Sequence, residues 1–102
     1  MPSIEQLEKL LALDPADPFI LYGLAQEHAK LGQTDAAINF YNRCLAADPA
    51  YCYAYFHKAK AQHDANRTAD AIATLHAGLL AARQAKDSHA ASEIQGFLDE
   101  LE

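Results

Sequence analysis

The stretch "LALDPADPF", from Leu11 to Phe19, is repeated 34 residues later as "LAADPAYCY", from Leu45 to Tyr53. The two stretches share leucine, alanine, aspartate, proline and a second alanine at matching positions, so that Pro15 corresponds to Pro49. The same interval relates further pairs along the chain: Ala25 and Ala59, Thr34 and Thr68, Ala37 and Ala71, Ile38 and Ile72. A period of this length indicates that the chain is built from repeated supersecondary units.

The hydrophobic pattern is helical throughout, because apolar residues recur every three or four positions and the strict alternation typical of strands is absent. Six helices are predicted, over residues 3–13, 18–31, 34–47, 51–65, 68–84 and 88–101. Asp17 followed by Pro18 is typical of a helix start, since proline suits the first helical position. Side-chain N-caps are predicted for the third, fifth and sixth helices at Thr34, Thr68 and Ser88. Asn66 is predicted to end the fourth helix in place of glycine.

Composition and charge argue against several classes of function. The 102 residues suffice for one domain, and an apolar fraction of 51% is too high for a disordered chain. The net charge of −6 is unfavourable for binding nucleic acid. No apolar run reaches the ~18 residues that a membrane helix needs, and no basic stretch followed by an apolar one marks a secretory signal. Two cysteines, Cys44 and Cys52, are too few for a disulfide framework, so the sequence predicts a cytoplasmic protein.

A helix–turn–helix unit with a 34-residue period resembles the tetratricopeptide repeat. The pattern of that family falls in one repeat on Leu21, Leu24, Ala25, His28, Ala37, Tyr41 and Pro49. In the next repeat it falls on Tyr55, Lys58, Ala59, Gln62, Ala71 and Leu75, with Arg83 where proline would stand. The whole chain is also similar to short stand-alone bacterial proteins of this family.

This resemblance implies an all-α fold, a right-handed α-solenoid of antiparallel helix pairs with six helices. Residues 18–51 and 52–85 are expected to be the two repeat units. Residues 3–13 and 88–101 are expected to be capping helices, because the ends of a solenoid need a polar outer face. Residues 1–102 would then form a single domain.

In this family the first helix of each repeat lines a concave groove that holds peptides, which implies a non-enzymatic protein-binding adaptor. The predicted core-facing residues of the second helix are Leu21, Leu24, Ala25, His28 and Leu31. The groove is expected on the neighbouring row, at Phe19, Tyr22, Gln26, Tyr53, Phe56, Lys60 and His63. Its aromatic residues suit an interface, and Lys60 with His63 favours a partner segment with apolar side chains and an acidic group. No nucleic acid or membrane is expected to take part.

Other functions have weaker support in the residues. The five histidines show no Ser-His-Asp or Cys-His arrangement, and the spacing of Cys44, Cys52 and His57 differs from zinc-binding patterns. No enzyme, metal or cofactor is therefore predicted. Family members that bind the carboxy terminus of heat-shock chaperones carry Lys and Asn where this chain has Tyr22, Gln26 and His57, so that role is not expected. The alternative is a structural subunit that associates with itself, the chain being a monomer or a weak homodimer.

Overall fold

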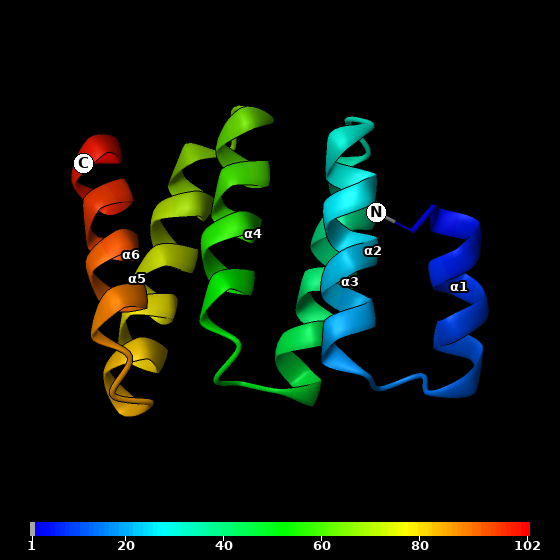
Figure 1. Ribbon diagram of the computed structural model, residues 1–102. Helices are drawn as coiled ribbons and strands as arrows, with labels where there is room; N and C mark the ends of the chain where they lie inside the picture. The colour runs from blue at the N-terminus through cyan, green and yellow to red at the C-terminus, as the bar shows by residue number, and fades with distance from the viewer. Residues whose placement is uncertain (1) are drawn as a thin grey trace. The chain divides into compact units, whose positions relative to one another are not determined.

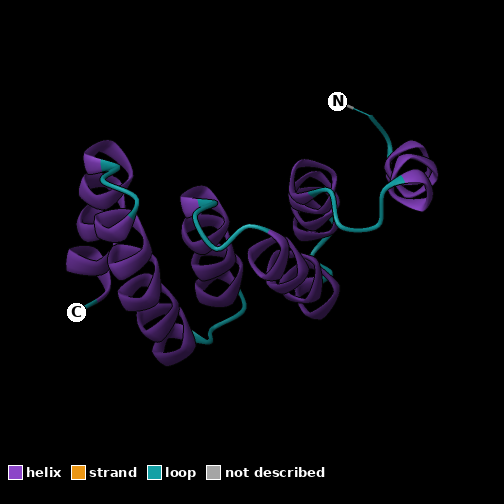
Figure 2. Ribbon diagram, turned by 90° about the horizontal axis from the view of Figure 1, so that it is seen from below, coloured by secondary structure: helices purple, strands orange, loops and turns teal. Residues whose placement is uncertain are grey.

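The computed structural model describes residues 2–102, which form six α-helices joined by short loops, with no strand among them (Figure 1, Figure 2). The prediction of an all-helical chain is confirmed. The helices fall into two compact units, Met1–Pro49 and Ala50–Glu102, with three helices in each. The assignment of residues 1–102 to a single domain stays a prediction.

The first unit consists of α1 (Ile4–Leu13), α2 (Pro18–Lys30) and α3 (Thr34–Ala47). Helix α2 packs against both of its neighbours. The buried residues of the unit are Leu7, Leu21, Leu24, Ala25, Ala37, Tyr41 and Cys44. Ala25 and Ala37 are fully buried, as small residues must be where two helices approach closely.

The second unit consists of α4 (Cys52–Asp64), α5 (Thr68–Gln84) and α6 (Ser88–Leu101). Helix α5 packs against both α4 and α6, and α4 also contacts α6. The core cluster comprises Cys52, Ala59, Ala71, Leu75, Leu79, Ala82, Ala90, Ile94 and Leu98. Two buried polar side chains satisfy each other across α4 and α5, because the Thr74 hydroxyl donates to Oε1 of Gln62 at 2.7 Å.

The predicted helix caps are partly corrected. Thr34, Thr68 and Ser88 are the first residues of their helices, and the N-cap positions are Gln33, Arg67 and Asp87. Asp87 accepts a hydrogen bond from the backbone N–H of Ala90 at 3.0 Å, since its carboxylate reaches the exposed amides of the first turn. The Thr68 hydroxyl is instead hydrogen-bonded to Nδ1 of His63 at 3.1 Å. Asn66 has a φ of 64°, which confirms its predicted role in place of glycine.

The predicted buried face of α2 includes one residue too many at the C-terminal end of the helix, Leu31. Leu31 is 63% exposed because the helix ends at Lys30 and Leu31 already lies in the turn. The earlier members of that face, Leu21 and Leu24, are buried as expected. A helical pattern thus predicts burial only as far as the helix continues.

Gly78 marks a close approach between α4 and α5. A Cβ atom at this position would lie 2.6 Å from the Cβ of Tyr55, so the two helices would have to separate. We expect Gly78→Ala to lower the free energy of unfolding by about 1–3 kcal/mol, the usual range for overpacking. Gly96→Ala is the matched control, because nothing lies within 4 Å of its Cβ position, and it should gain about 0.5–1 kcal/mol. Urea unfolding of both variants tests the pair, and equal shifts would contradict the close approach.

Candidate functional site

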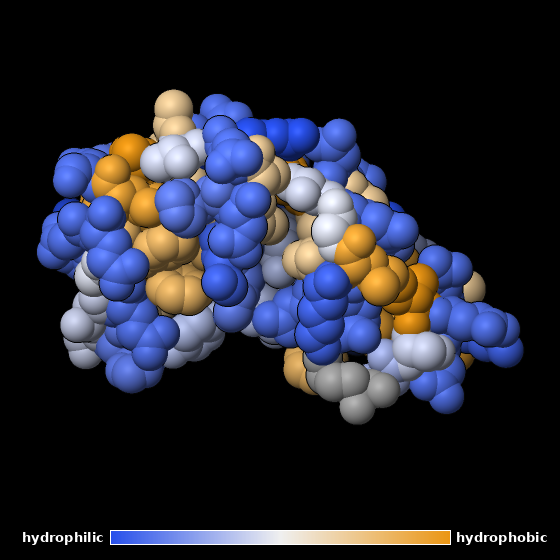
Figure 3. Space-filling view, turned by 90° about the horizontal axis from the view of Figure 1, so that it is seen from above, coloured by the Kyte–Doolittle hydropathy of each residue, from blue (hydrophilic) through white to orange (hydrophobic). Residues whose placement is uncertain are grey.

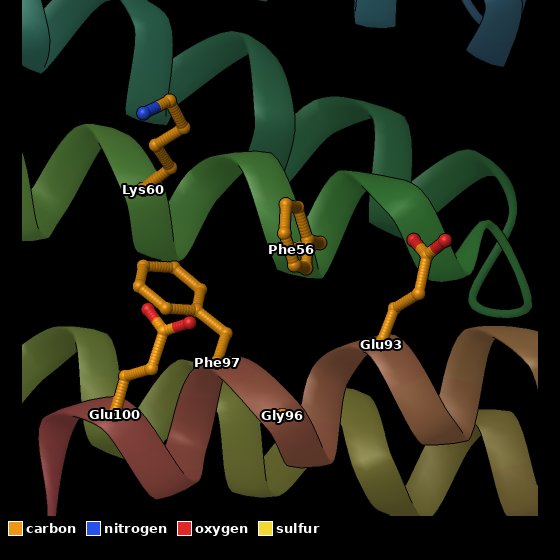
Figure 4. A pocket seen from close by; sticks show the side chains of 6 residues that line it. All are labelled: Phe56, Lys60, Glu93, Gly96, Phe97 and Glu100. Carbon is orange, nitrogen blue, oxygen red and sulfur yellow. The ribbon is translucent and has the colours of Figure 1, made fainter.

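An open groove lies between α4 and α6 of the second unit. Its volume is about 420 Å³, within the range of roughly 300–1,000 Å³ common for ligand sites. The lining residues, here called the aromatic groove, are Phe56, Lys60, Glu93, Gly96, Phe97 and Glu100 (Figure 4). Two of them come from α4 and four from α6, so the packing of both helices on α5 positions the site.

Two phenylalanine rings form the apolar centre of the groove. The centroids of Phe56 and Phe97 lie 5.3 Å apart across the two helices, with the rings tilted at 49° (Figure 4). Histidine rings extend this cluster along α4: His57 lies edge-on to Phe56, and His63 lies edge-on to Phe97. Both phenylalanines are half-buried and pack against the core of the unit, so they are held in place while one part of each stays accessible.

Charged side chains border this apolar centre. Glu93 and Glu100 project from α6 on the two sides of Gly96 (Figure 4). Lys60 supplies the positive charge on α4, and its Nζ lies 3.8 Å from the Asp64 carboxylate. Carboxylates therefore outnumber the ammonium group around the groove.

Burial and the charged residues of the groove shift the pKa values of His57 and Tyr53. Burial lowers the pKa of His57, and the positive charge of Lys60 lowers it further, against the opposing effect of Glu93. His57 is therefore neutral at pH 7 and brings no charge to the groove. Partial burial raises the pKa of Tyr53, and the carboxylates of Glu93 and Asp87 add to this shift.

Four of the residues that were predicted for the site lie on α4 in the second unit: Tyr53, Phe56, Lys60 and His63. Phe56 and Lys60 line the aromatic groove directly, and His63 contacts it through Phe97. Tyr53 is 36% exposed on the first turn of the helix. That these four residues bind a partner stays a prediction.

The other three predicted residues, Phe19, Tyr22 and Gln26, lie on α2 in the first unit. Tyr22 packs edge-on against Tyr41, and its hydroxyl accepts a hydrogen bond from Nε2 of Gln26 at 2.9 Å. Phe19 is 73% exposed. Tyr22 and Gln26 thus interact with each other, and their role in binding stays a prediction.

The residues contributed by α6 were not anticipated from the sequence. Residues 88–101 were expected to be a capping helix, which drew attention to the buried stripe that contains Ile94 and Leu98. Glu93, Phe97 and Glu100 are spaced by four and three residues, so they share the adjacent face of the same helix. This spacing in the sequence could have identified α6 as the second helix that lines the groove.

Exposed apolar side chains alone do not define the site. The large ones are Leu10, Leu13, Phe19, Leu31, Tyr53 and Leu80. In the space-filling view, patches of hydrophobic surface appear among hydrophilic side chains on both units (Figure 3). The aromatic groove is distinguished by its concave shape, its two facing rings and its bordering charges.

Features that would support other chemistry are few. Among residues 2–102, no group of three or more histidine, cysteine or acidic side chains is arranged to hold a metal ion. Burial raises the pKa of the Cys44 thiol to about 11, with a further contribution from Asp48, so the thiol is protonated at neutral pH. None of the helices in the described part of the chain has both the length and the apolar character needed to cross a membrane.

Comparison with known proteins places the chain in a family. The family model described as tetratricopeptide repeat matches residues 3–62 and 28–92. The chain therefore belongs to the tetratricopeptide-repeat family, and its fold is the all-α helical solenoid of such repeats. The boundaries of its individual repeat units, 18–51 and 52–85, stay a prediction.

Several individual proteins are similar over most of the chain. A TPR repeat-containing protein of Pseudomonas aeruginosa is 30% identical over 97% of this chain and 94% of its own length. The solution structure of a tetratricopeptide repeat domain protein from Salinibacter ruber is 36% identical, with a TM-score of 0.79 over 87% of this chain and 90% of that chain. The TPR2B domain of yeast Sti1, solved in complex with pHsp70, is 26% identical, with a TM-score of 0.88 over 96% of this chain and 78% of that chain.

Proposed function

We propose that this chain is a protein-interaction module that binds a segment of a partner protein in the aromatic groove. The observation that carries the proposal is the pair Phe56 and Phe97, whose rings face each other from different helices inside an open groove with charged borders. Aromatic side chains offer a large contact area at a low entropic cost, and they are typical anchors of protein interfaces. The mechanism is therefore recognition: the rings take up an apolar side chain, and the charges select its neighbours.

The family supports a protein as the partner. The TPR2B domain of yeast Sti1 forms a complex with pHsp70, and it resembles 96% of the length of the present chain. We carry over the binding of a protein segment, and not the identity of that partner. The charges around the aromatic groove differ from those expected of a chaperone-binding member, since α6 carries no lysine or arginine.

Gly96→Leu tests the groove without removing any existing contact. Nothing lies within 4 Å of the Cβ position of Gly96, so a leucine there would project into the groove while the helix keeps its packing. We expect this variant to bind partners at least about tenfold more weakly, a loss of about 1.4 kcal/mol or more. The measurement is capture of proteins from the source cell by the tagged chain, quantified by mass spectrometry.

Leu80→Ala is the control for this experiment. Leu80 is 58% exposed on α5 and does not line the groove, so its loss removes an apolar surface side chain from the same unit. We expect this variant to retain the partners that Gly96→Leu loses. A folded Gly96→Leu variant that keeps every partner would show that the aromatic groove is not the binding site.

The alternative function, a subunit that associates with itself, predicts a different result from the same variant. If the groove bound a second copy of the chain, sedimentation of the wild type would depend on concentration, and Gly96→Leu would sediment as a monomer. Sedimentation velocity therefore separates the two functions, because an adaptor that is monomeric at high concentration should behave identically with and without the substitution.

A further inference from the structure

We infer that the partner segment is an extended stretch in which basic residues flank one large apolar side chain. This inference rests on the proposed function and names the chemistry of its ligand. The apolar side chain would contact Phe56 and Phe97, while lysine or arginine side chains would pair with Glu93 and Glu100. The sequence alone favoured the opposite charge, an acidic group on the partner, because Lys60 and His63 stand out in the linear chain.

The balance of charge around the aromatic groove favours a basic partner. Glu93 and Glu100 are exposed side chains that line it from α6. The positive charge opposite them is Lys60, which lies 3.8 Å from the Asp64 carboxylate of its own helix. Glu93, Glu100 and Asp64 together carry three carboxylates against the one ammonium group of Lys60, so an approaching acidic side chain meets net repulsion and a basic one net attraction.

The contact between Glu93 and His89 does not prevent this pairing. Oε1 of Glu93 lies 2.9 Å from Nε2 of His89, one turn earlier on α6. The His89 side chain is 73% exposed, and polar contacts between exposed side chains contribute little to stability. A lysine or arginine of the partner can therefore replace His89 at small cost.

The spacing of the two carboxylates along α6 predicts the spacing of the basic residues. Glu93 and Glu100 are seven residues apart, which corresponds to about 10 Å along a helix at a rise of 1.5 Å per residue. An extended chain covers that distance in about three residues. The apolar side chain falls between them, because Gly96 and Phe97 lie between the carboxylates (Figure 4). Because the side chains of an extended chain alternate between its two faces, the expected motif has two basic residues four positions apart with a leucine, methionine or phenylalanine midway between them, so that all three side chains lie on one face. Four positions span about 13 Å, and the long lysine or arginine side chains take up the difference.

The width of the groove favours an extended segment over a helical one. The ring centroids of Phe56 and Phe97, which belong to its two walls, lie 5.3 Å apart, whereas a helix with its side chains is about 10 Å wide. A helical segment would also need about seven residues, or two turns, to bring two basic side chains to both carboxylates. An extended segment reaches both carboxylates within about five residues.

Selection from a phage library of random 12-residue peptides, with the full chain as bait, tests the motif. We expect the enriched peptides to carry basic residues on both sides of a large apolar residue.

A synthetic peptide with the enriched sequence is then measured by fluorescence anisotropy against the wild type and four variants: Glu93→Gln, Glu100→Gln, Lys60→Gln and Gly96→Leu. We expect each glutamate substitution to weaken binding about 2- to 5-fold, the range of exposed ion pairs. Lys60→Gln should leave the affinity unchanged or raise it.

The outcomes separate this inference from the proposed function. Enriched peptides that are acidic, or whose binding is unchanged by both glutamate substitutions, would overturn the basic motif. If Gly96→Leu still weakened those peptides, the aromatic groove would remain the binding site for a partner of other chemistry. If no peptide were enriched, or if the enriched peptides bound Gly96→Leu as tightly as the wild type, both proposals would fail.

Discussion

Replacing Tyr41 by alanine is expected to lower the free energy of unfolding by about 3–5 kcal/mol, the cost of deleting a large buried aromatic side chain. Tyr41 is the largest fully buried side chain of the first unit, with 1% of its surface exposed. Its ring also packs edge-on against Tyr22 of α2. The loss is a large share of the ~5–15 kcal/mol that stabilises a domain of this size. Urea unfolding followed by circular dichroism gives the value.

Tyr41→Phe is the matched control, because it keeps the ring and removes the hydroxyl. Burial raises the pKa of Tyr41 well above its ordinary value, with contributions from Tyr22 and Cys44. The unfolded chain therefore loses this proton at lower pH than the folded one, and the wild type should lose stability as the pH rises above about 10. We expect the phenylalanine variant to lose less over that interval. A Tyr41→Ala variant with a cost below about 1 kcal/mol would show that this side chain does not hold α2 and α3 together.

Deleting residues 88–102 is expected to abolish the cooperative unfolding of the second unit. This deletion removes α6, whose Ile94 and Leu98 are buried against α5. Each large apolar side chain contributes about 1.5–3 kcal/mol through burial, and the deletion also exposes Leu75 and Leu79 to water. The truncated chain should aggregate or lose helical content at temperatures where the full chain is folded. Circular dichroism and light scattering of the purified proteins measure both effects.

His76→Ala is the control for the truncation. Nε2 of His76 lies 2.8 Å from Oε1 of Glu102, an exposed contact between α5 and the end of the chain that the deletion also removes. We expect this substitution to change the free energy of unfolding by less than about 1 kcal/mol, because both side chains are exposed to solvent. A truncated protein as stable and monodisperse as the His76→Ala variant would contradict the role of α6 as a cover for α5.

Much of the fold follows from the sequence because the 34-residue repeat gives α2 and α3 counterparts in α4 and α5. Pro15 and Pro49 stand 34 residues apart, and the alanines at the helix crossings recur at the same interval, so errors in one copy are corrected by the other. The helices of residues 2–102 lie where the pattern predicts them, within one residue at their ends. Lys86 shows what such a pattern misses: its φ is 57°, a conformation for which glycine or asparagine is the usual signal.

Only the part of the candidate site that lies on α4 was predicted from the sequence, and the reason is physical. Phe56 and Lys60 belong to a helix with a counterpart in the repeat, so the position of their row could be inferred from periodicity. Phe97 and Glu100 belong to α6, which has no counterpart at the 34-residue interval to compare with. Which charge dominates a groove depends on the distances between residues from different helices, such as Glu93 and Lys60, and a linear pattern contains no such distances.

The two helices that line the aromatic groove, α4 and α6, both pack against α5, which supplies none of the lining residues. The contact at Gly78 holds Tyr55 of α4 against it, and a Cβ atom there would also lie 3.3 Å from the Cδ1 atom of Ile94 on α6. We therefore expect a larger side chain at residue 78 to shift α4 and α6 relative to α5 and so to change the width of the groove, although residue 78 does not line it. A substitution at this buried position would alter which partner side chains fit, while the lining residues themselves stay the same.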